Sequence, residues 1–239
     1  MTSRHHNYVV LDLETFGPDG AVLTLLEEPT AARNLKDPEK IAADIADKRQ
    51  ARDKACSLDP YGGRIVCVGW QTESERLVSC CPTEDEERDA ICAVAIAIRA
   101  ASRHVIGFVC LRFDIPWLIT RARLLDVDFP DLDLRKYGNR DITDLQALLT
   151  FDGTAPDGAF KRSLANFARR FGIPVHDTTT GAEVAAMVRE GRWDDIEAHC
   201  ASDLDLTVAL AERLRLIPKF GINVKSIGVS YVPNTREVF

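Results

Sequence analysis

The order in which strand-like and helix-like stretches follow one another constrains the fold of this chain most. Three stretches rich in β-branched and apolar residues come first, at 7–13, 63–70 and 76–80, and such stretches favour strands. Helical patterns then alternate with two short strands, at 104–109 and near Asp141. A run of strands followed by such alternation is typical of α/β proteins. We therefore expect an α/β fold in which helices flank a mixed five-stranded sheet.

Local capping signals place the helices between these strands. Thr83 and Glu86 form a capping box at the start of one helix, and Gly172 with Pro174 ends another. The expected helices cover 37–56, 83–102, 115–125, 144–149, 163–171, 181–189 and 193–214.

Two segments lie outside this regular pattern. Residues 18–61 form an insertion between two strands that should be neighbours, and a charged helix begins there at Asp37. A solvated surface helix is the simpler interpretation, and a lid over a substrate channel is the alternative. At the other end, 217–239 forms a C-terminal extension whose apolar part, 222–232, fits either an extra strand or a contact between copies. We expect one domain over 1–239 that carries both segments.

Composition and charge narrow the class of protein. With 46% hydrophobic and 28% charged residues, the chain resembles soluble globular proteins. No apolar run approaches the roughly 20 residues that cross a bilayer, so no membrane partner is expected. The start of the sequence lacks the apolar core of a signal peptide, and the seven cysteines form no C-x-x-C pair. Reduced thiols and a cytoplasmic location are therefore expected.

The net charge of −7 argues against a broad cationic surface for nucleic acid, unless clustered carboxylates are neutralised by bound cations.

Carboxylates at the ends of expected strands and helices provide the first local motif. Asp12 and Glu14 close the first strand, in LDLETFG, and residues two apart on a strand share a face. The two charges should raise each other's pKa unless a cation lies between them, although D-x-E is also common at strand ends. Asp114, in RFDIPWL, and Asp144, in ITDLQALL, each precede a helix, where aspartate is an ordinary N-cap.

Asp203 is harder to explain as a surface charge. The last helix carries a core-facing stripe with spacings of three and four residues, and Asp203 occupies one of its positions. The stripe comprises Ile196, Cys200, Asp203, Thr207, Leu210 and Leu214. A buried carboxylate needs a cation or several hydrogen-bond donors. His199 lies one turn earlier on the same side of the helix. A helical histidine is more often a packing residue, but its place beside Asp203 favours a catalytic hypothesis.

In order and spacing, these motifs resemble those of the DEDD-type 3′→5′ exonucleases of the RNase H-like superfamily. LDLETFG is similar to their first motif, GFVCLRFDIPWL to the second, and HCASDLDLT to the third, written Y-C-x-x-D-V-x-x-T in the tyrosine subgroup. The form is that of the exonuclease domains of family B DNA polymerases and of their phage and prophage relatives. The resemblance covers most of the chain from Tyr8 to Arg213 and includes TDLQALL and SLANFARRFGIP.

This resemblance implies an RNase H-like fold and a phosphodiester hydrolase that acts on nucleic-acid 3′ ends. Single-stranded ends are expected, and DNA more than RNA. Four carboxylates would bind two Mg²⁺ or Mn²⁺ ions: Asp12, Glu14, Asp114 and Asp203. His199 would act as the general base, and Thr15 and Phe16 would meet the terminal nucleotide.

Two positions depart from the family pattern. His199 stands four residues before Asp203, as the tyrosine does, whereas the histidine subgroup has one residue more, and one residue turns a side chain by about 100° around a helix. Phe108 and Val109 follow Gly107, where family B members carry Tyr-Asn or His-Asn. Two alternatives stay open: a weakened DEDD domain that serves as a metal-dependent nucleic-acid-binding or scaffolding module, and an unrelated α/β protein. The second alternative predicts that the acidic residues are scattered in space.

Overall fold

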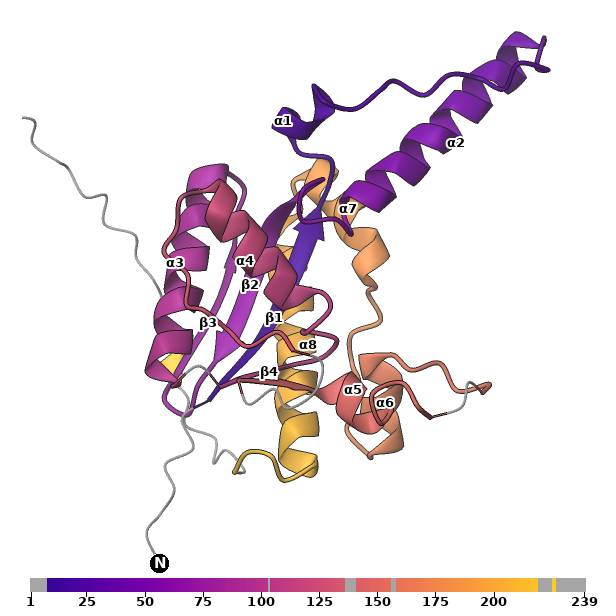
Figure 1. The fold of residues 1–239 in the computed structure, drawn as a ribbon. Helices are drawn as coiled ribbons and strands as arrows, with labels where there is room; N and C mark the ends of the chain where they lie inside the picture. Colours follow the sequence, from indigo (N-terminus) through magenta and orange to yellow (C-terminus); the bar gives the residue numbers. More distant parts are fainter. Residues whose placement is uncertain (1–7, 103, 136–140, 156–157, 219–224, 227–239) are drawn as a thin grey trace, which may run out of the picture.

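A mixed β-sheet forms the centre of the protein (Figure 1). The computed structural model describes residues 8–102, 104–135, 141–155, 158–218 and 225–226. The strands are β1 (Val9–Phe16), β2 (Arg64–Gln71), β3 (Glu75–Cys80), β4 (Val105–Gly107), β5 (Ile142–Asp144) and β6 (Lys225–Ser226). Their order is β5-β4-β1-β2-β3-β6. β1 is antiparallel to β2 and parallel to β4, β2 and β3 are antiparallel, and β4 and β5 are parallel. These pairings confirm the predicted mixed sheet, to which β6 adds a two-residue edge along β3.

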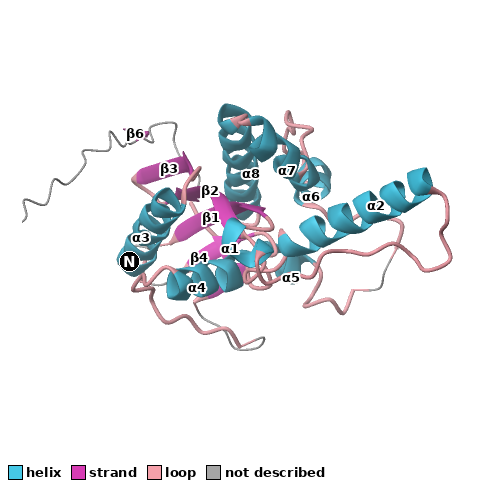
Figure 2. Ribbon diagram, turned by 90° about the horizontal axis from the view of Figure 1, so that it is seen from above, coloured by secondary structure: helices cyan, strands magenta, loops and turns pink. Residues whose placement is uncertain are grey.

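Helices cover both faces of this sheet. The helices of the described chain are α1 (Gly20–Leu23), α2 (Pro38–Cys56), α3 (Glu84–Ala100), α4 (Asp114–Leu124), α5 (Leu145–Leu149), α6 (Leu164–Arg170), α7 (Gly181–Glu190) and α8 (Trp193–Arg213). α3 and α4 pack together against β2, while α8 lies across β1, β2 and β3 on the other face (Figures 1 and 2). α6 and α7 pack beside α8. The predicted capping box of Thr83 and Glu86 is present at the start of α3.

The alternation of side chains along β1 decides which face receives its carboxylates. Val9 and Leu11 are buried in the core that contains α3 and α4. Tyr8 and Val10 are buried in the core that contains α6 and α8. Because residues two apart on a strand share a face, Asp12 continues the α8 side of the sheet.

Gly69 allows α8 to approach β1 closely at this level. It is the β2 residue that pairs with Asp12. A Cβ atom at Gly69 would lie 3.0 Å from Sγ of Cys200 and 3.5 Å from Cδ2 of Leu204. The predicted stripe of α8 faces this contact, with Ile196 and Cys200 fully buried. α8 is therefore held close to the sheet. Side chains that lie beside its buried stripe can then reach the end of β1.

The two segments outside the regular pattern differ in how they relate to the core. α2 projects away from the sheet in both views and, along its length, only Cys56 is buried (Figures 1 and 2). Most of α2 is thus a solvated helix rather than a cover. In the C-terminal extension, residues 219–224 and 227–239 lie outside the described residues, so the two interpretations of 222–232 stay predictions beyond β6. No helix in the described part of the chain has the length and apolarity to cross a membrane.

Candidate functional site

One cavity collects the acidic residues that the motifs singled out. It has a volume of about 470 Å³ and lies where the end of β1 meets the start of α4 and the middle of α8. The predicted residues that line it are Asp12, Glu14, Thr15, Asp114, His199 and Asp203. They come from three separate elements, so the acidic side chains are not scattered as an unrelated α/β protein would predict.

Asp12 lies at the base of this arrangement. Its Oδ2 atom is buried and has no hydrogen-bond partner among the described residues. Burial raises the pKa of Asp12 well above its ordinary value, and the charges of Glu14, Asp114 and Asp203 raise it further. A buried carboxylate oxygen without a donor is unfavourable in a folded protein unless a cation or a water satisfies it.

Glu14 and Asp114 are also kept from water. Glu14 is 7% exposed, and burial raises its pKa from 4.5 to about 8 against the opposing effect of His199. Asp114 is 4% exposed, and burial raises its pKa from 3.8 to about 7. The N-cap of α4 is Phe113, and no side chain caps this helix end. The ordinary N-cap interpretation of Asp114 is therefore wrong.

Asp144 differs from Asp114 in this respect. Its side chain caps α5 by accepting a hydrogen bond from the backbone N–H of Ala147 at 3.0 Å. It also accepts from the N–H groups of Val109 and Leu111, each at 3.2 Å. Val109 has a φ of 63°, which is rare for a β-branched residue. Asp144 thus holds the strained turn that leads from β4 towards Asp114.

His199 lies between two carboxylates, and one of them was not predicted. Its Nδ1 atom is 2.6 Å from Oδ2 of Asp177, and its Nε2 atom is 3.4 Å from Oε1 of Glu14. Burial alone would lower the pKa of His199, but Glu14, Asp177 and Asp203 outweigh it and raise that pKa above 6.5. Asp177 is in turn oriented by the backbone N–H of Thr179, which donates to Oδ1 at 2.8 Å. No local pattern marks Asp177, because its contact with α8 is tertiary.

Asp203 is half-buried on α8, one turn beyond His199. Burial raises its pKa, and His199 opposes that rise. The acidic residues share the cavity without being preassembled around an ion. Among the described residues, no group of three or more histidine, cysteine or carboxylate side chains already has the arrangement of a metal site.

Thr15 and Phe16, predicted to meet a terminal nucleotide, lie in different surroundings. Thr15 lines the cavity, and its Oγ1 donates a hydrogen bond to the carbonyl oxygen of Ser57 at 2.7 Å. Phe16 is not among the residues that line it. Its ring packs on the cluster around Val66, and the Arg189 guanidinium lies 5.6 Å from the ring centroid. The ring thus packs beside α7, and its contact with a terminal nucleotide stays a prediction.

The remaining walls of the acidic cavity are partly apolar and come from segments that the motifs did not highlight. Leu58 belongs to the end of the insertion, while Phe108 and Phe113 flank the turn between β4 and α4. Both rings are half-buried. The cavity therefore combines the acidic side chains with apolar side chains and with polar ones, among them Gln146 and Arg162.

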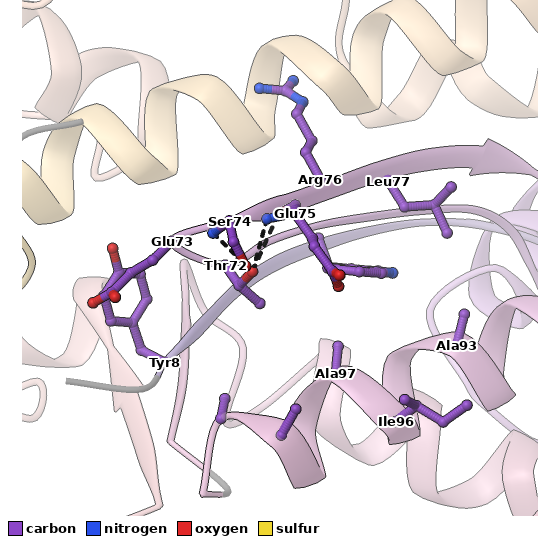
Figure 3. Close-up of a pocket in the computed structure, with 13 residues that line it drawn as sticks. Tyr8, Thr72, Glu73, Ser74, Glu75, Arg76, Leu77, Ala93, Ile96 and Ala97 are labelled. Atoms are coloured by element: carbon purple, nitrogen blue, oxygen red, sulfur yellow. Dashed lines mark hydrogen bonds between the residues drawn. The ribbon is translucent and has the colours of Figure 1, made fainter. Parts of the chain in front are cut away.

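A second cavity, of about 500 Å³, lies between the β2–β3 hairpin and α3. Figure 3 shows Ala93, Ile96 and Ala97 of α3 facing Leu77 and the turn at Thr72. None of the predicted site residues lines this cavity. Its lining offers no converging set of acidic side chains, so the cavity at the end of β1 is the candidate site.

Comparison with known proteins bears on the fold. No family model matches the chain, and no curated protein matches it. It is similar to a solved structure, the family B DNA polymerase from the hyperthermophilic archaeon Pyrobaculum calidifontis, with a TM-score of 0.56 and 17% sequence identity. The match covers 87% of this chain and 24% of the polymerase chain, so the chain spans about a quarter of the polymerase's length. The likeness shows an α/β fold shared with part of that polymerase, consistent with an RNase H-like fold.

Proposed function

We propose that this chain is a metal-dependent 3′→5′ exonuclease that hydrolyses phosphodiester bonds at the 3′ ends of nucleic acids, with DNA as the favoured substrate. The observation that carries the proposal is the shared cavity of Asp12, Glu14, Asp114, His199 and Asp203. The likeness to a family B DNA polymerase supports a role with nucleic acid.

The four carboxylates have the ligand chemistry that two hard divalent cations require. Carboxylate oxygens are the ligands that Mg²⁺ and Mn²⁺ prefer, and Oδ2 of Asp12 has no partner among the described residues. The raised pKa values of Asp12, Glu14 and Asp114 follow from burial of acidic groups that bound cations would stabilise as carboxylates. Asp12, Glu14, Asp114 and Asp203 would hold the ions. Bound Mg²⁺ or Mn²⁺ would supply a water that ionises near neutral pH and would stabilise charge on the leaving oxygen.

The chain's own groups would handle the proton of the attacking water. Asp177 accepts the hydrogen bond from Nδ1 of His199 and so favours the tautomer whose Nε2 is free to accept a proton. Water adds to the phosphorus, the bond between phosphorus and the 3′ oxygen breaks, and the 3′ oxygen leaves with a proton. The products are a nucleoside 5′-monophosphate and a strand that is one nucleotide shorter.

Incubation of the chain with 5′-labelled single-stranded DNA and RNA tests the proposal. We expect a ladder that shortens from the 3′ end with Mn²⁺ or Mg²⁺, and intact strands in EDTA. Asp203→Asn should abolish the ladder. Asp205→Asn is the matched control, because Asp205 lies two residues further along α8 and its side chain is 62% exposed. Hydrolysis that persists in EDTA or in Asp203→Asn would contradict the proposal. Divalent-dependent binding without hydrolysis would instead support a scaffolding module.

A further inference from the structure

The insertion returns to the domain at the wall of the acidic cavity. α2 ends at Cys56, and the carbonyl oxygen of Ser57 accepts the hydrogen bond from Thr15. A Cβ atom at Gly17 would lie only 2.6 Å from the carbonyl carbon of Cys56, so the glycine permits this close contact. The end of the insertion is therefore packed directly against the residues that follow Glu14.

The turn after α2 is held in place on both sides of Leu58. The N–H of Leu58 donates to the carbonyl oxygen of Ala55 at 3.1 Å. Beyond it, the N–H of Gly62 donates to the carbonyl oxygen of Asp59 at 2.8 Å, and the N–H of Tyr61 donates to the Asp59 side chain at 3.0 Å. These bonds fix the backbone, so Leu58 presents its side chain from a defined position.

Leu58 lines the acidic cavity although 61% of it is exposed. A single exposed leucine is common on protein surfaces and by itself says nothing. Leu58 differs from Leu25, which is 83% exposed in the same insertion but is not among the residues that line this cavity. Leu58 thus differs from other exposed leucines because it lies at the edge of the cavity that contains the acidic side chains.

The two chemistries of the cavity match the two parts of a nucleotide. Metal-bound carboxylates suit a phosphate, whereas apolar side chains suit the flat faces of a base. Phe108 and Phe113 already contribute half-buried rings to the same cavity. Its volume of about 470 Å³ lies within the roughly 300–1,000 Å³ of small-ligand sites.

We propose that Leu58 packs against the base of the 3′-terminal nucleotide, so that the insertion contributes a specificity-determining contact. This inference rests on the proposed exonuclease function.

The test compares Leu58→Ala with the matched control Leu25→Ala on two single-stranded oligonucleotides, one with an ordinary 3′-terminal base and one with an abasic terminal residue. For the ordinary end, Leu58→Ala should raise KM by about three- to tenfold, the range expected when part of a base contact is lost. For the abasic end, Leu58→Ala and the wild type should have the same KM. Leu25→Ala should match the wild type on both, and Leu58→Met should restore most of the affinity. Equal KM values for Leu58→Ala and Leu25→Ala, or an equal effect on both oligonucleotides, would overturn the inference.

A binding measurement separates this inference from the proposed function. Fluorescence anisotropy of the same oligonucleotides with Mn²⁺, in an Asp12→Asn background with and without Leu58→Ala, reads the terminal-base contact without hydrolysis. A wild type that lacks divalent-dependent hydrolysis would defeat the proposed function, while binding still reports on Leu58. A wild type that hydrolyses DNA, combined with no effect of Leu58→Ala on binding, would defeat the Leu58 inference alone.

Discussion

The Nδ1 atom of His199 lies 2.6 Å from Oδ2 of Asp177, so a carboxylate from the loop before α7 holds a buried imidazole on α8. Burial would raise the pKa of Asp177, but hydrogen bonds from Thr179 and His199 outweigh it and leave that pKa below 3.8. Asp177 is therefore ionised near neutral pH and stabilises the protonated form of His199. This pair gives the histidine a fixed orientation and a raised basicity.

Replacing Asp177 with asparagine should weaken that support. We expect Asp177→Asn to lower kcat about 10–100-fold near pH 7 with little change in KM, because the imidazole loses its charged partner. Activity should rise with pH as His199 loses its proton. In Asp177→Asn the midpoint of that rise should move to lower pH, because the pKa of His199 falls when the carboxylate is removed. A pH–rate profile measures both effects, and a profile identical to that of Asp205→Asn would contradict the role of Asp177.

Changes at His199 itself test whether the imidazole acts as the base. His199→Ala should be about 10²–10⁴-fold slower, which is the usual contribution of a general base. His199→Tyr should keep more activity, with the profile moved to higher pH because the ordinary pKa of tyrosine is about 10. If His199→Ala runs at the wild-type rate at every pH, the imidazole is a packing residue.

The buried carboxylates should make the metal-free fold sensitive to pH. Folding raises the pKa of Glu14 from 4.5 to about 8 and that of Asp114 from 3.8 to about 7. The folded state therefore binds more protons than the unfolded chain in this range, and its stability should be lost as pH rises from about 4 to 8. In EDTA, the free energy of unfolding measured in urea should fall by on the order of 6 kcal/mol between pH 5 and 8.

Two comparisons check the source of that decline. Glu14→Gln should make it less steep, because the amide does not ionise while Asp114 still does, and Mn²⁺ should restore stability at pH 8 for the wild type. Asp205→Asn should keep the wild-type slope, since Asp205 lies at the surface. An unchanged slope in Glu14→Gln would show that the carboxylates of the cavity do not control the pH dependence.

A different pair of charges should control the stability of the scaffold. Glu87 is fully buried and accepts bonds from Nε and a terminal nitrogen of Arg121 at 2.7 and 2.8 Å, linking α3 to α4. Glu87→Ala removes the two short bonds of the buried arginine and leaves it only the longer contacts with Asp19 and Glu84, at 3.4 and 3.8 Å. It should lower the free energy of unfolding by about 3 kcal/mol. Asp85→Ala removes the exposed partner of Arg88 and should change it by less than about 0.5 kcal/mol. Urea unfolding of both variants measures these changes. Equal losses in the free energy of unfolding would contradict the prediction.

The sequence predicted the elements well wherever a local pattern determines them. β1 is recognisable because its residues are β-branched and apolar, and α3 because Thr83 and Glu86 cap it. Asp203 could be singled out because the apolar stripe of α8 surrounds it. Order and spacing then brought Asp12 and Asp114 into the same hypothesis, and both line one cavity with Asp203.

The residues that were missed depend on contacts between distant parts of the chain. Asp177 meets His199 across 22 residues, and its own neighbourhood shows only a local turn. Leu58 reaches the cavity because the insertion folds back onto Thr15, 42 residues before Ser57. Phe16 packs against an apolar cluster beside α7, which its own sequence neighbourhood does not indicate. These contacts depend on which surfaces meet after folding, so the spacing of residues in the sequence does not predict them.

Gly69 contributes no side-chain atom to the cavity, yet it determines the clearance between α8 and the sheet at the level of Asp12. A methyl group there would lie 3.0 Å from Cys200 Sγ, so the sulfur would have to shift by a few tenths of an ångström. Because α8 also carries Asp203 and His199, any part of that shift that the helix takes up would move them away from the carboxylates of β1. The distance between the side chains of α8 and those of β1 thus depends on position 69 having no side chain. A substitution there that adds no charge and removes no ligand would still change the geometry of the site.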